Sequence, residues 1–160
     1  MPNAERLRQP SRESAVNSGG EARPSPAPAP LPRVLVVDDD AIDRMLAWAK
    51  LDVLGCNAVA VGSGQAALEK LAEEHFDLAF MDCRMPNLDG YETTRRLRRR
   101  EARGEVAHHG RLPVIAATSG PGYRDRCEAA GMSDVLVKPY SRDEIRIILK
   151  RWLRDDGTGE

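Results

Sequence analysis

Short apolar runs alternate with longer amphipathic segments along most of the chain. The five apolar runs each comprise three or four residues, at 34–37, 58–61, 78–81, 114–117 and 135–137. Runs of this length, each followed by a helical pattern, are typical of buried strands in repeated βα units. The pattern therefore predicts an α/β fold: a right-handed, doubly wound parallel sheet of five strands covered by five helices.

Capping signals mark where the predicted helices begin and end. Asp40 and Ser63 each precede an amphipathic segment, and their side chains can accept the unpaired backbone N–H groups of a first helical turn. Ser141 and Glu144 have the spacing of a capping box, in which each side chain bonds the other residue's backbone. Gly55 is placed to stop the first of these helices.

The first 32 residues differ in composition from the rest of the chain. They combine small polar and charged residues with a proline-rich run at 23–32, and they hold too few apolar groups to offset the entropy of ordering. We predict a disordered Pro/Ala/Ser-rich arm and linker at 1–32, a folded domain at 33–154 and a short tail at 155–160. A proline-rich ligand for a partner's aromatic groove is the less favoured alternative.

The charge balance excludes some classes of partner. The chain has 24 basic and 25 acidic residues and a net charge of -1, so no global field attracts it to nucleic acid or to an anionic membrane. Three cysteines without paired spacing, and no apolar run resembling a signal peptide or a membrane span, indicate a reduced cytoplasmic setting. We expect a monomer or weak dimer that binds neither nucleic acid nor membrane directly.

Reactive side chains follow four of the predicted strands. They are Asp38, Asp39 and Asp40 after the first strand, Asp82 after the third, Thr118 and Ser119 after the fourth, and Lys138 after the fifth. Doubly wound sheets bind ligands beyond the carboxyl ends of their strands, so these groups are predicted to share one pocket. Carboxylates at close range raise one another's pKa and resist burial, which indicates a hard cation with oxygen ligands. Magnesium fits better than zinc because no His or Cys stands at ligand spacing.

The same residue types suit phosphoryl transfer to a carboxylate. An aspartate can be the nucleophile, a metal ion and a lysine can neutralise the equatorial phosphoryl oxygens, and a hydroxyl can donate to one of them. The predicted pocket contains a residue type for each of these tasks. We therefore expect the chain to accept a phosphoryl group on a carboxylate.

Four segments resemble the receiver domain of response regulators. They are residues 34–39, 81–92, 117–118 and 130–139, in the family's order, and the resemblance covers residues 33 to 153. The motifs Asp-Cys-Arg-Met-Pro and Asp-Gly-Tyr-Glu are most similar to those in receivers of hybrid histidine kinases and phosphorelays. The resemblance implies a flavodoxin-like sheet with strand order 2-1-3-4-5. It also implies a phosphohistidine donor, carried by a histidine kinase or a histidine phosphotransfer protein.

The resemblance assigns metal and acceptor roles to residues at the strand ends. It implies that Asp82 is the phosphoacceptor. It further implies that Asp38, Asp39, Asp82 and the backbone carbonyl of Arg84 hold Mg²⁺, for which Mn²⁺ can substitute. Asp40 lies just outside this set and is interpreted as a helix cap.

Further roles concern the phosphoryl group and the switch. Thr118 and Lys138 would bind phosphoryl oxygens, with Ser119 beside them, and the peptide bond before Pro139 would be cis. Many relatives have an aromatic residue three positions before the lysine that moves with the threonine, whereas this chain has Val135. We therefore expect weakened or differently wired coupling between the acceptor and the rest of the domain.

Two segments depart from the family pattern. Residues 119–123, Ser-Gly-Pro-Gly-Tyr, argue for a loop and a curtailed fourth helix. The arginine-rich stretch at 95–111 lengthens the third helix and its loop, and a solvated helix face is favoured there over a basic docking surface. His108 and His109 in that loop are not favoured as a metal site, and Cys83 is interpreted as a buried apolar residue.

Together these features predict a signalling switch rather than an enzyme with turnover. The domain would catalyse its own phosphorylation and dephosphorylation on Asp82, and an unidentified downstream protein would respond to the phosphate. One alternative is a receiver-like interaction module that works without phosphorylation. Another is a metal-dependent phosphatase with an aspartyl intermediate, which would need a carboxylate where Arg84 stands.

Overall fold

The computed structural model describes residues 30–153. The predicted N-terminal arm lies outside the described residues except for its last three positions, and the predicted C-terminal tail lies wholly outside them. Within the described part of the chain, no helix combines the length and the apolar character needed to cross a membrane.

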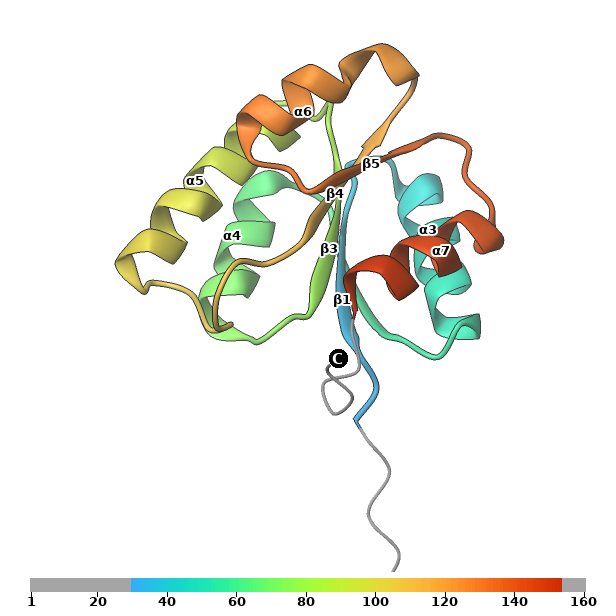
Figure 1. Cartoon of the computed structure of the whole chain (residues 1–160), viewed down its shortest axis with the longest axis horizontal. Helices are drawn as coiled ribbons and strands as arrows, with labels where there is room; N and C mark the ends of the chain where they lie inside the picture. Colours follow the sequence, from blue (N-terminus) through green and yellow to red (C-terminus); the bar gives the residue numbers. More distant parts are fainter. Residues whose placement is uncertain (1–29, 154–160) are drawn as a thin grey trace, which may run out of the picture. The chain divides into compact units, whose positions relative to one another are not determined.

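Five parallel strands form one sheet in the order β2-β1-β3-β4-β5 (Figure 1). The strands are β1 (Arg33–Val37), β2 (Asn57–Val61), β3 (Leu78–Asp82), β4 (Val114–Thr118) and β5 (Asp134–Val137). Each strand is one residue longer than the apolar run that predicted it. The fold class and the strand order expected from the sequence are confirmed.

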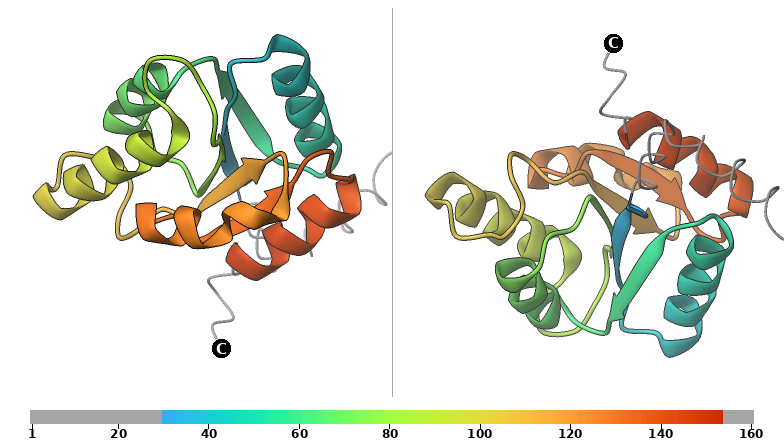
Figure 2. Two further views of the ribbon diagram at one scale, coloured as in Figure 1. Left: turned by 90° about the horizontal axis from the view of Figure 1, so that it is seen from above. Right: turned by 90° about the horizontal axis from the view of Figure 1, so that it is seen from below.

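Helices cover both faces of the sheet (Figure 1 and Figure 2). Helices α3 (Ala41–Val53) and α7 (Arg142–Trp152) lie on one face, and α4 (Gly64–Glu73), α5 (Gly90–Arg103) and α6 (Arg124–Ala130) lie on the other. A 3₁₀ turn at Pro121–Tyr123 precedes α6, which has only 7 residues. The curtailed fourth helix expected from two glycines around a proline is therefore confirmed.

The two faces of the sheet bury separate apolar cores. Successive residues of a strand point to opposite faces. Leu35 and Val37 of β1 pack with α4, α5 and α6, whereas Val34 and Val36 pack with α3 and α7. Every residue of β3 and β4 is buried. Burial on both faces explains why the strands appear in the sequence as continuous apolar runs instead of alternating ones.

The predicted helix caps are present. The Asp40 carboxylate accepts hydrogen bonds from the backbone N–H groups two and three residues later, each at 2.9 Å. Ser63 caps α4 by accepting from the N–H three residues later at 3.0 Å. Ser141 and Glu144 form the capping box at the start of α7. Gly55, with a φ of 87°, follows the end of α3.

A buried polar network anchors the long loop after α5. The Glu101 carboxylate accepts a hydrogen bond from Arg98 Nη1 at 2.9 Å and from His108 Nε2 at 2.8 Å. It also accepts from the Leu112 backbone N–H at 2.8 Å. Burial opposes the charge on Glu101, but these three hydrogen bonds outweigh it and lower the pKa of the carboxyl. His108 is thus the buried partner of a carboxylate that ties the loop to the helix.

Removing the Glu101 carboxylate should destabilise the fold. In a Glu101→Ala variant the donors of Arg98 and His108 would stay buried without an acceptor, so we expect the free energy of unfolding to fall by about 2–4 kcal/mol. Urea denaturation followed by circular dichroism measures this loss. Glu105→Ala is the control, because Glu105 is exposed and lies 3.8 Å from Arg103. It should change the same free energy by less than about 0.5 kcal/mol, and equal losses in both variants would contradict the anchoring role.

Candidate functional site

The parallel register brings four reactive residues to one edge of the sheet. The last residue of β1 pairs with the residue before Asp82, so Asp38 and Asp82 leave neighbouring strands at the same level. Asp82 pairs in turn with the residue before Thr118, and Thr118 pairs with the residue before Lys138. The side chains that the sequence analysis assigned to one pocket therefore meet at the carboxyl edge, as expected for a doubly wound sheet.

Three carboxylates form a compact group at this edge. Asp38, Asp39 and Asp82 each place one oxygen within 4.8 Å of the others, and no other such group of three potential ligands occurs among the described residues. Asp38 and Asp82 are buried, whereas Asp39 is exposed. Hard oxygen ligands at this spacing fit Mg²⁺, which binds one or two carboxylates and keeps several waters. Arg84 lines the adjoining cleft, and the metal-binding role of its backbone carbonyl stays a prediction.

The Lys138 ammonium bridges three carboxylates. Its Nζ lies 3.0 Å from Asp38 Oδ2, 3.3 Å from Asp43 Oδ2 and 3.4 Å from Asp82 Oδ1. Burial opposes the ammonium charge, but the hydrogen bond to Asp38 and the negative charges of the aspartates outweigh it and raise the pKa of Lys138. The peptide bond between Lys138 and Pro139 is cis. Lys138 is therefore a permanent positive charge next to Asp82.

Two effects oppose ionisation of Asp82. Burial, followed by repulsion from Asp38, raises its pKa to about 6, although Lys138 and a backbone hydrogen bond from Arg84 act in the opposite direction. One ammonium does not balance the charge of the carboxylates around it. A divalent cation on the same oxygens would favour the ionised form of Asp82, the form that can act as a nucleophile.

Two residues that the sequence analysis did not single out help to build the site. Asp43, in the first turn of α3, contacts Lys138. Gly90 lets the start of α5 approach the end of β3, because a Cβ at this position would lie 2.2 Å from the Asp82 carbonyl oxygen. The Gly90 N–H donates to the Cys83 carbonyl at 3.0 Å. For Gly90, the sequence signal was the pair Asp89-Gly90, which forms the N-cap and the first residue of α5.

Thr118 lines an open cleft of about 720 Å³ together with Asp82, Ser119 and Lys138. Its Oγ1 donates to the Gly120 carbonyl at 2.6 Å and accepts from the Gly120 N–H at 3.0 Å. The hydroxyl must therefore leave the Gly120 carbonyl before it can donate to a phosphoryl oxygen on Asp82. Ser119 is exposed at the wall of the same cleft.

Aromatic surface reaches the cleft from elements other than β5. Val135 of β5 is half-buried and packs against the same core as Tyr123, which belongs to the 3₁₀ turn before α6. Tyr91 and Tyr123 both line the cleft that contains Thr118. The Arg126 guanidinium lies 4.2 Å from the centroid of the Tyr91 ring. The aliphatic position in β5 is thus accompanied by two tyrosines on neighbouring elements.

Cys83 follows the candidate acceptor in the chain and is buried. Its Sγ lies 3.9 Å from the Sγ of Cys127, and both thiols are free. Burial raises the pKa of the Cys83 thiol, which keeps it protonated and unreactive. This environment fits the apolar role predicted for Cys83.

Comparisons with known proteins point to one family. The family model of the response regulator receiver domain matches residues 34–150. Curated relatives include virulence sensor protein BvgS of Bordetella bronchiseptica, 41% identical over 133 residues, and sensor protein GacS of Pseudomonas syringae, 33% identical over 129 residues. These alignments cover 81% and 79% of this chain but 10% and 14% of the two proteins, so the chain spans a small part of its curated relatives' length.

Solved structures share the fold. The receiver domain of sensor histidine kinase PA1611 from Pseudomonas aeruginosa, with magnesium coordinated in its active-site cleft, is 36% identical with a TM-score of 0.67. The match covers 77% of this chain and 98% of that one. The receiver domain of the histidine kinase CKI1 from Arabidopsis thaliana, complexed with Mg²⁺ and BeF₃⁻, is 36% identical with a TM-score of 0.63, and the match covers 73% and 89% of the two chains.

Loss of one carboxylate from the group of three should weaken metal binding. In an Asp39→Asn variant, an exposed ligand loses its charge while the buried pair stays intact, so we expect the Mg²⁺ affinity to fall by at least about tenfold. Isothermal titration calorimetry with magnesium chloride measures the affinity.

Asp40→Asn is the matched control for this experiment. It removes the same charge from the next residue, and asparagine caps a helix as well as aspartate does. The Mg²⁺ affinity should then change by less than about twofold, because an exposed charge outside the ligand set is screened. If both variants lose affinity equally, the cation responds only to the overall negative charge of the edge.

Proposed function

Because the chain belongs to the response regulator receiver domain family, we propose that it is a phosphoacceptor switch of a two-component system or phosphorelay. Asp82 would take a phosphoryl group from a phosphohistidine on a histidine kinase or a histidine phosphotransfer protein. The convergence of Asp82 with Asp38, Asp39 and Lys138 carries this proposal. The sensor proteins among its relatives and the magnesium-bound receiver structures support it.

Each residue of the site has a task in the transfer step. An Asp82 carboxylate oxygen attacks the phosphorus atom while the phosphorus–nitrogen bond to the donor imidazole breaks, which gives an aspartyl phosphate and frees the imidazole. Lys138 neutralises a phosphoryl oxygen, and Thr118 turns to donate its hydroxyl to another. A divalent cation held by Asp38 and Asp39 supplies, when bound, further neutralisation of the phosphoryl charge.

The same site supports removal of the phosphate. The cleft leaves space for a water beside Asp82, with Arg84 and Ser119 at its wall. The domain would therefore catalyse both its own phosphorylation and its own dephosphorylation, without turning over a separate substrate. Mn²⁺ should substitute for Mg²⁺, because both ions accept carboxylate, carbonyl and water ligands.

The cysteines support an intracellular setting for this switch. Cys83 and Cys127 lie within contact distance without being bonded, and Cys56 is also free. Free, closely spaced thiols fit a reducing compartment, so we place the domain in the cytoplasm. There it would act as a monomer or weak dimer on a downstream protein partner.

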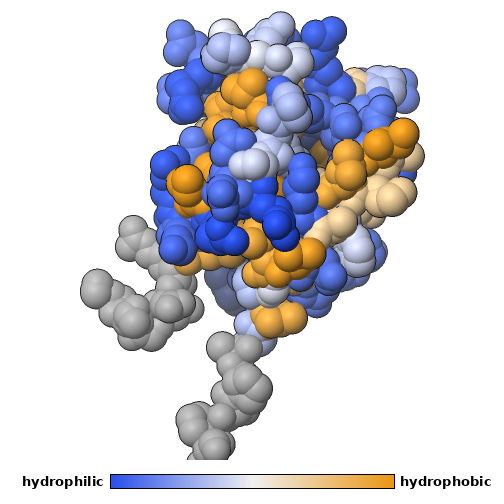
Figure 3. All heavy atoms as spheres, turned by 90° about the vertical axis from the view of Figure 1, so that its right-hand side faces the viewer, coloured by the Kyte–Doolittle hydropathy of each residue, from blue (hydrophilic) through white to orange (hydrophobic). Residues whose placement is uncertain are grey.

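We infer that the phosphohistidine donor docks over α3. Ile42, Met45 and Leu46 of this helix are 67%, 63% and 51% exposed. A hollow of about 260 Å³ beside them is lined by Leu46, Tyr140 and Lys138. Through Lys138 it connects the helix surface with the carboxyl edge of the sheet, where Asp82 lies. Figure 3 shows apolar side chains exposed on this side of the molecule. An apolar surface on the donor could cover them while its phosphohistidine approaches Asp82.

The assignment of Asp82 as the phosphoacceptor predicts a covalent aspartyl phosphate that mass spectrometry can detect. Incubation with a small-molecule phosphodonor and magnesium should add one phosphoryl group to the purified chain, measured by intact mass spectrometry. The gain should disappear without magnesium and in an Asp82→Asn variant, because the cation and the nucleophile are both required. A gain that persists in the variant would place the phosphate elsewhere. If phosphohistidine donors also fail, the phosphorylation-independent interaction module becomes the better description.

The docking assignment predicts a change specific to protein donors. A Leu46→Asp variant should slow transfer from a phosphohistidine-bearing phosphotransfer protein by about tenfold or more, because it places a charge in the centre of an apolar contact. Phosphorylation by a small-molecule donor should stay within about twofold, since the acceptor chemistry is untouched. Val53→Asp is the control at the far end of the same helix, where Val53 is 63% exposed. Equal slowing in both variants would argue against docking at Leu46.

A further inference from the structure

Helix α5 carries six arginines, two glutamates and no lysine. Arg98 and Glu101 are paired inside the network that anchors the following loop. The other five arginines form one face of the helix, within about 140° of arc at 3.6 residues per turn. They are Arg95, Arg96, Arg99, Arg100 and Arg103.

These five guanidinium groups share few carboxylates. Glu92 alone serves three of them, at 3.0, 3.2 and 3.4 Å. Glu105 approaches Arg103 only to 3.8 Å. Arg95, Arg99 and Arg103 repeat at intervals of four residues, and like charges at this spacing destabilise a helix. Helix stability therefore does not explain why the face is so basic.

Arg126 of α6 continues this basic face to the acceptor cleft. Its guanidinium lies over the ring of Tyr91, in the first turn of α5, and it lines the same cleft as Asp82. We call Arg126 and the five arginines of α5 the basic ridge. The ridge runs from the cleft along the outer surface of α5 toward its carboxyl end.

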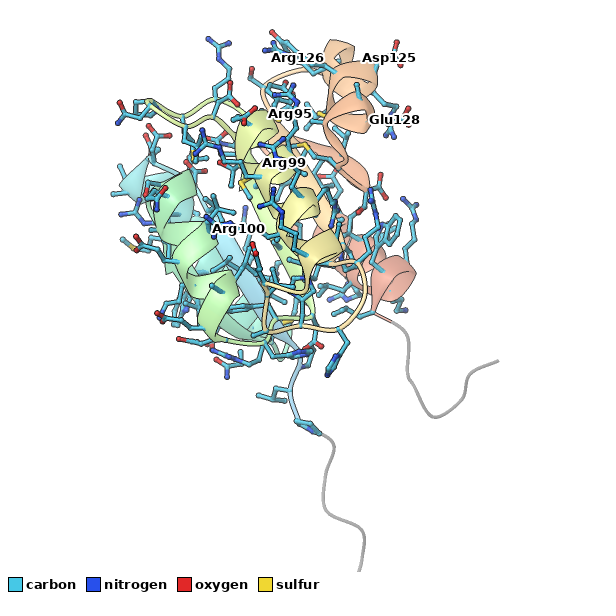
Figure 4. All side chains as sticks on the ribbon, turned by 90° about the vertical axis from the view of Figure 1, so that its left-hand side faces the viewer. Arg95, Arg99, Arg100, Asp125, Arg126 and Glu128 are labelled. Carbon is cyan, nitrogen blue, oxygen red and sulfur yellow. The ribbon has the colours of Figure 1, made fainter. Side chains whose placement is uncertain are left out.

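Acidic residues limit the ridge on its α6 side. Figure 4 shows Arg95, Arg99 and Arg126 on the side of α5 and α6 that faces the viewer. Asp125 and Glu128 lie on the outer flank of α6, away from α5. The basic surface is therefore narrow across and extended along the helix, where Arg95 to Arg103 covers roughly 12 Å.

We propose that the basic ridge, for which the sequence favoured a solvated helix face, is a docking surface for an acidic segment of a partner protein. The cations are all arginines, whose planar forks bind carboxylates with two hydrogen bonds at once. A segment with several Asp or Glu side chains along roughly 12 Å, about four residues of extended chain, would match the ridge. It would supply the carboxylates that the five α5 arginines lack.

A protein segment fits this surface better than nucleic acid does. A duplex would extend beyond the ridge and bring its phosphates close to Asp125 and Glu128. The chain also has a net charge of -1, so little attraction remains outside the ridge. A short acidic peptide stays within the arginine face and avoids both penalties.

The ridge and the donor surface lie on opposite faces of the sheet. Figure 1 shows α3 on one side of the strands and α5 and α6 on the other. An acidic partner on the ridge would therefore leave α3 open to a phosphohistidine donor. Because Arg126 lines the acceptor cleft, the partner would also sit next to Asp82. The proposal thus adds a second protein contact, separate from the phosphoryl donor.

Binding of a labelled acidic peptide to the full chain tests this assignment. The probe is fluorescein-labelled octaglutamate, followed by fluorescence anisotropy at low ionic strength. An R95Q/R99Q/R103Q variant should bind roughly tenfold more weakly, as expected when three exposed ion pairs are lost. R99E is a second variant in case the triple variant does not fold, and it should weaken binding in the same direction.

The matched control is R142Q/R146Q/K150Q in α7. These three basic residues are exposed and repeat at the same four-residue spacing, so the loss of net charge and its geometry are identical. Octaglutamate affinity should change by less than about twofold in this control. Thermal unfolding should show that both triple variants stay folded, and phosphorylation on Asp82 should be retained in both. The docking proposal can therefore fail while the phosphoacceptor proposal stands, and the reverse.

Four outcomes would overturn the proposal. Equal loss in the α5 and α7 variants would mean that octaglutamate responds only to net charge, and no loss in either variant would mean that it does not bind the ridge. Tighter, arginine-dependent binding of a twelve-base-pair DNA duplex or of phosphatidylserine vesicles would assign the ridge to a different partner class. Self-association that disappears in the α5 variant, measured by sedimentation velocity, would assign it to a second copy of this chain.

Discussion

The site at the carboxyl edge of the sheet, here called the acceptor edge, depends on one electrostatic constraint: a single ammonium group offsets only part of the charge of the carboxylates that the fold brings together. The parallel register places Asp38 and Asp82 at neighbouring strand ends, and both side chains are buried, so neither can turn into solvent. Lys138 contacts both of them and also Asp43, but one positive charge leaves the edge negative. The remaining charge makes the edge a cation site. Under the proposed function, a phosphoryl group, which carries negative charge of its own, would need that cation in order to be accepted there.

Much of this arrangement could be predicted from the sequence because the information is local. Each strand contains a continuous apolar run, and the runs of β1, β3 and β4 are buried on both faces. Such a run directly precedes Asp38, Asp82, Thr118 and Lys138. Helix caps such as Asp40 and Ser63 are also local signals, because each side chain bonds backbone N–H groups two or three residues later. The fold class and the gathering of carboxylates with a lysine therefore followed from residue order and the geometry of parallel sheets, whereas the strand order was implied by the resemblance to receiver domains.

Other features depend on distances between elements, which no local pattern encodes. Asp43 contacts Lys138 because the first turn of α3 packs close to the acceptor edge. Gly90 is needed because α5 begins close to the end of β3: a Cβ at position 90 would lie 2.2 Å from the Asp82 carbonyl oxygen. The bond between Glu101 and His108 closes a long loop without hydrophobic periodicity, so the sequence offered no reason to pair these residues. Each of these contacts depends on how neighbouring elements are placed in space.

Under the proposed function, the aliphatic residue in β5 would change how a signal leaves the site. In this structure the Thr118 hydroxyl donates a hydrogen bond to the Gly120 carbonyl and accepts one from the Gly120 N–H. Gly120 immediately precedes the 3₁₀ turn that contains Tyr123. If Thr118 turns toward a phosphoryl group, it gives up both bonds, and the segment released first is the one that positions Tyr123. Val135 has no hydrogen-bonding group and little surface with which to follow that movement. Coupling under the proposed function would therefore run from Thr118 into the turn before α6, toward Tyr91 and the cleft, rather than outward through β5.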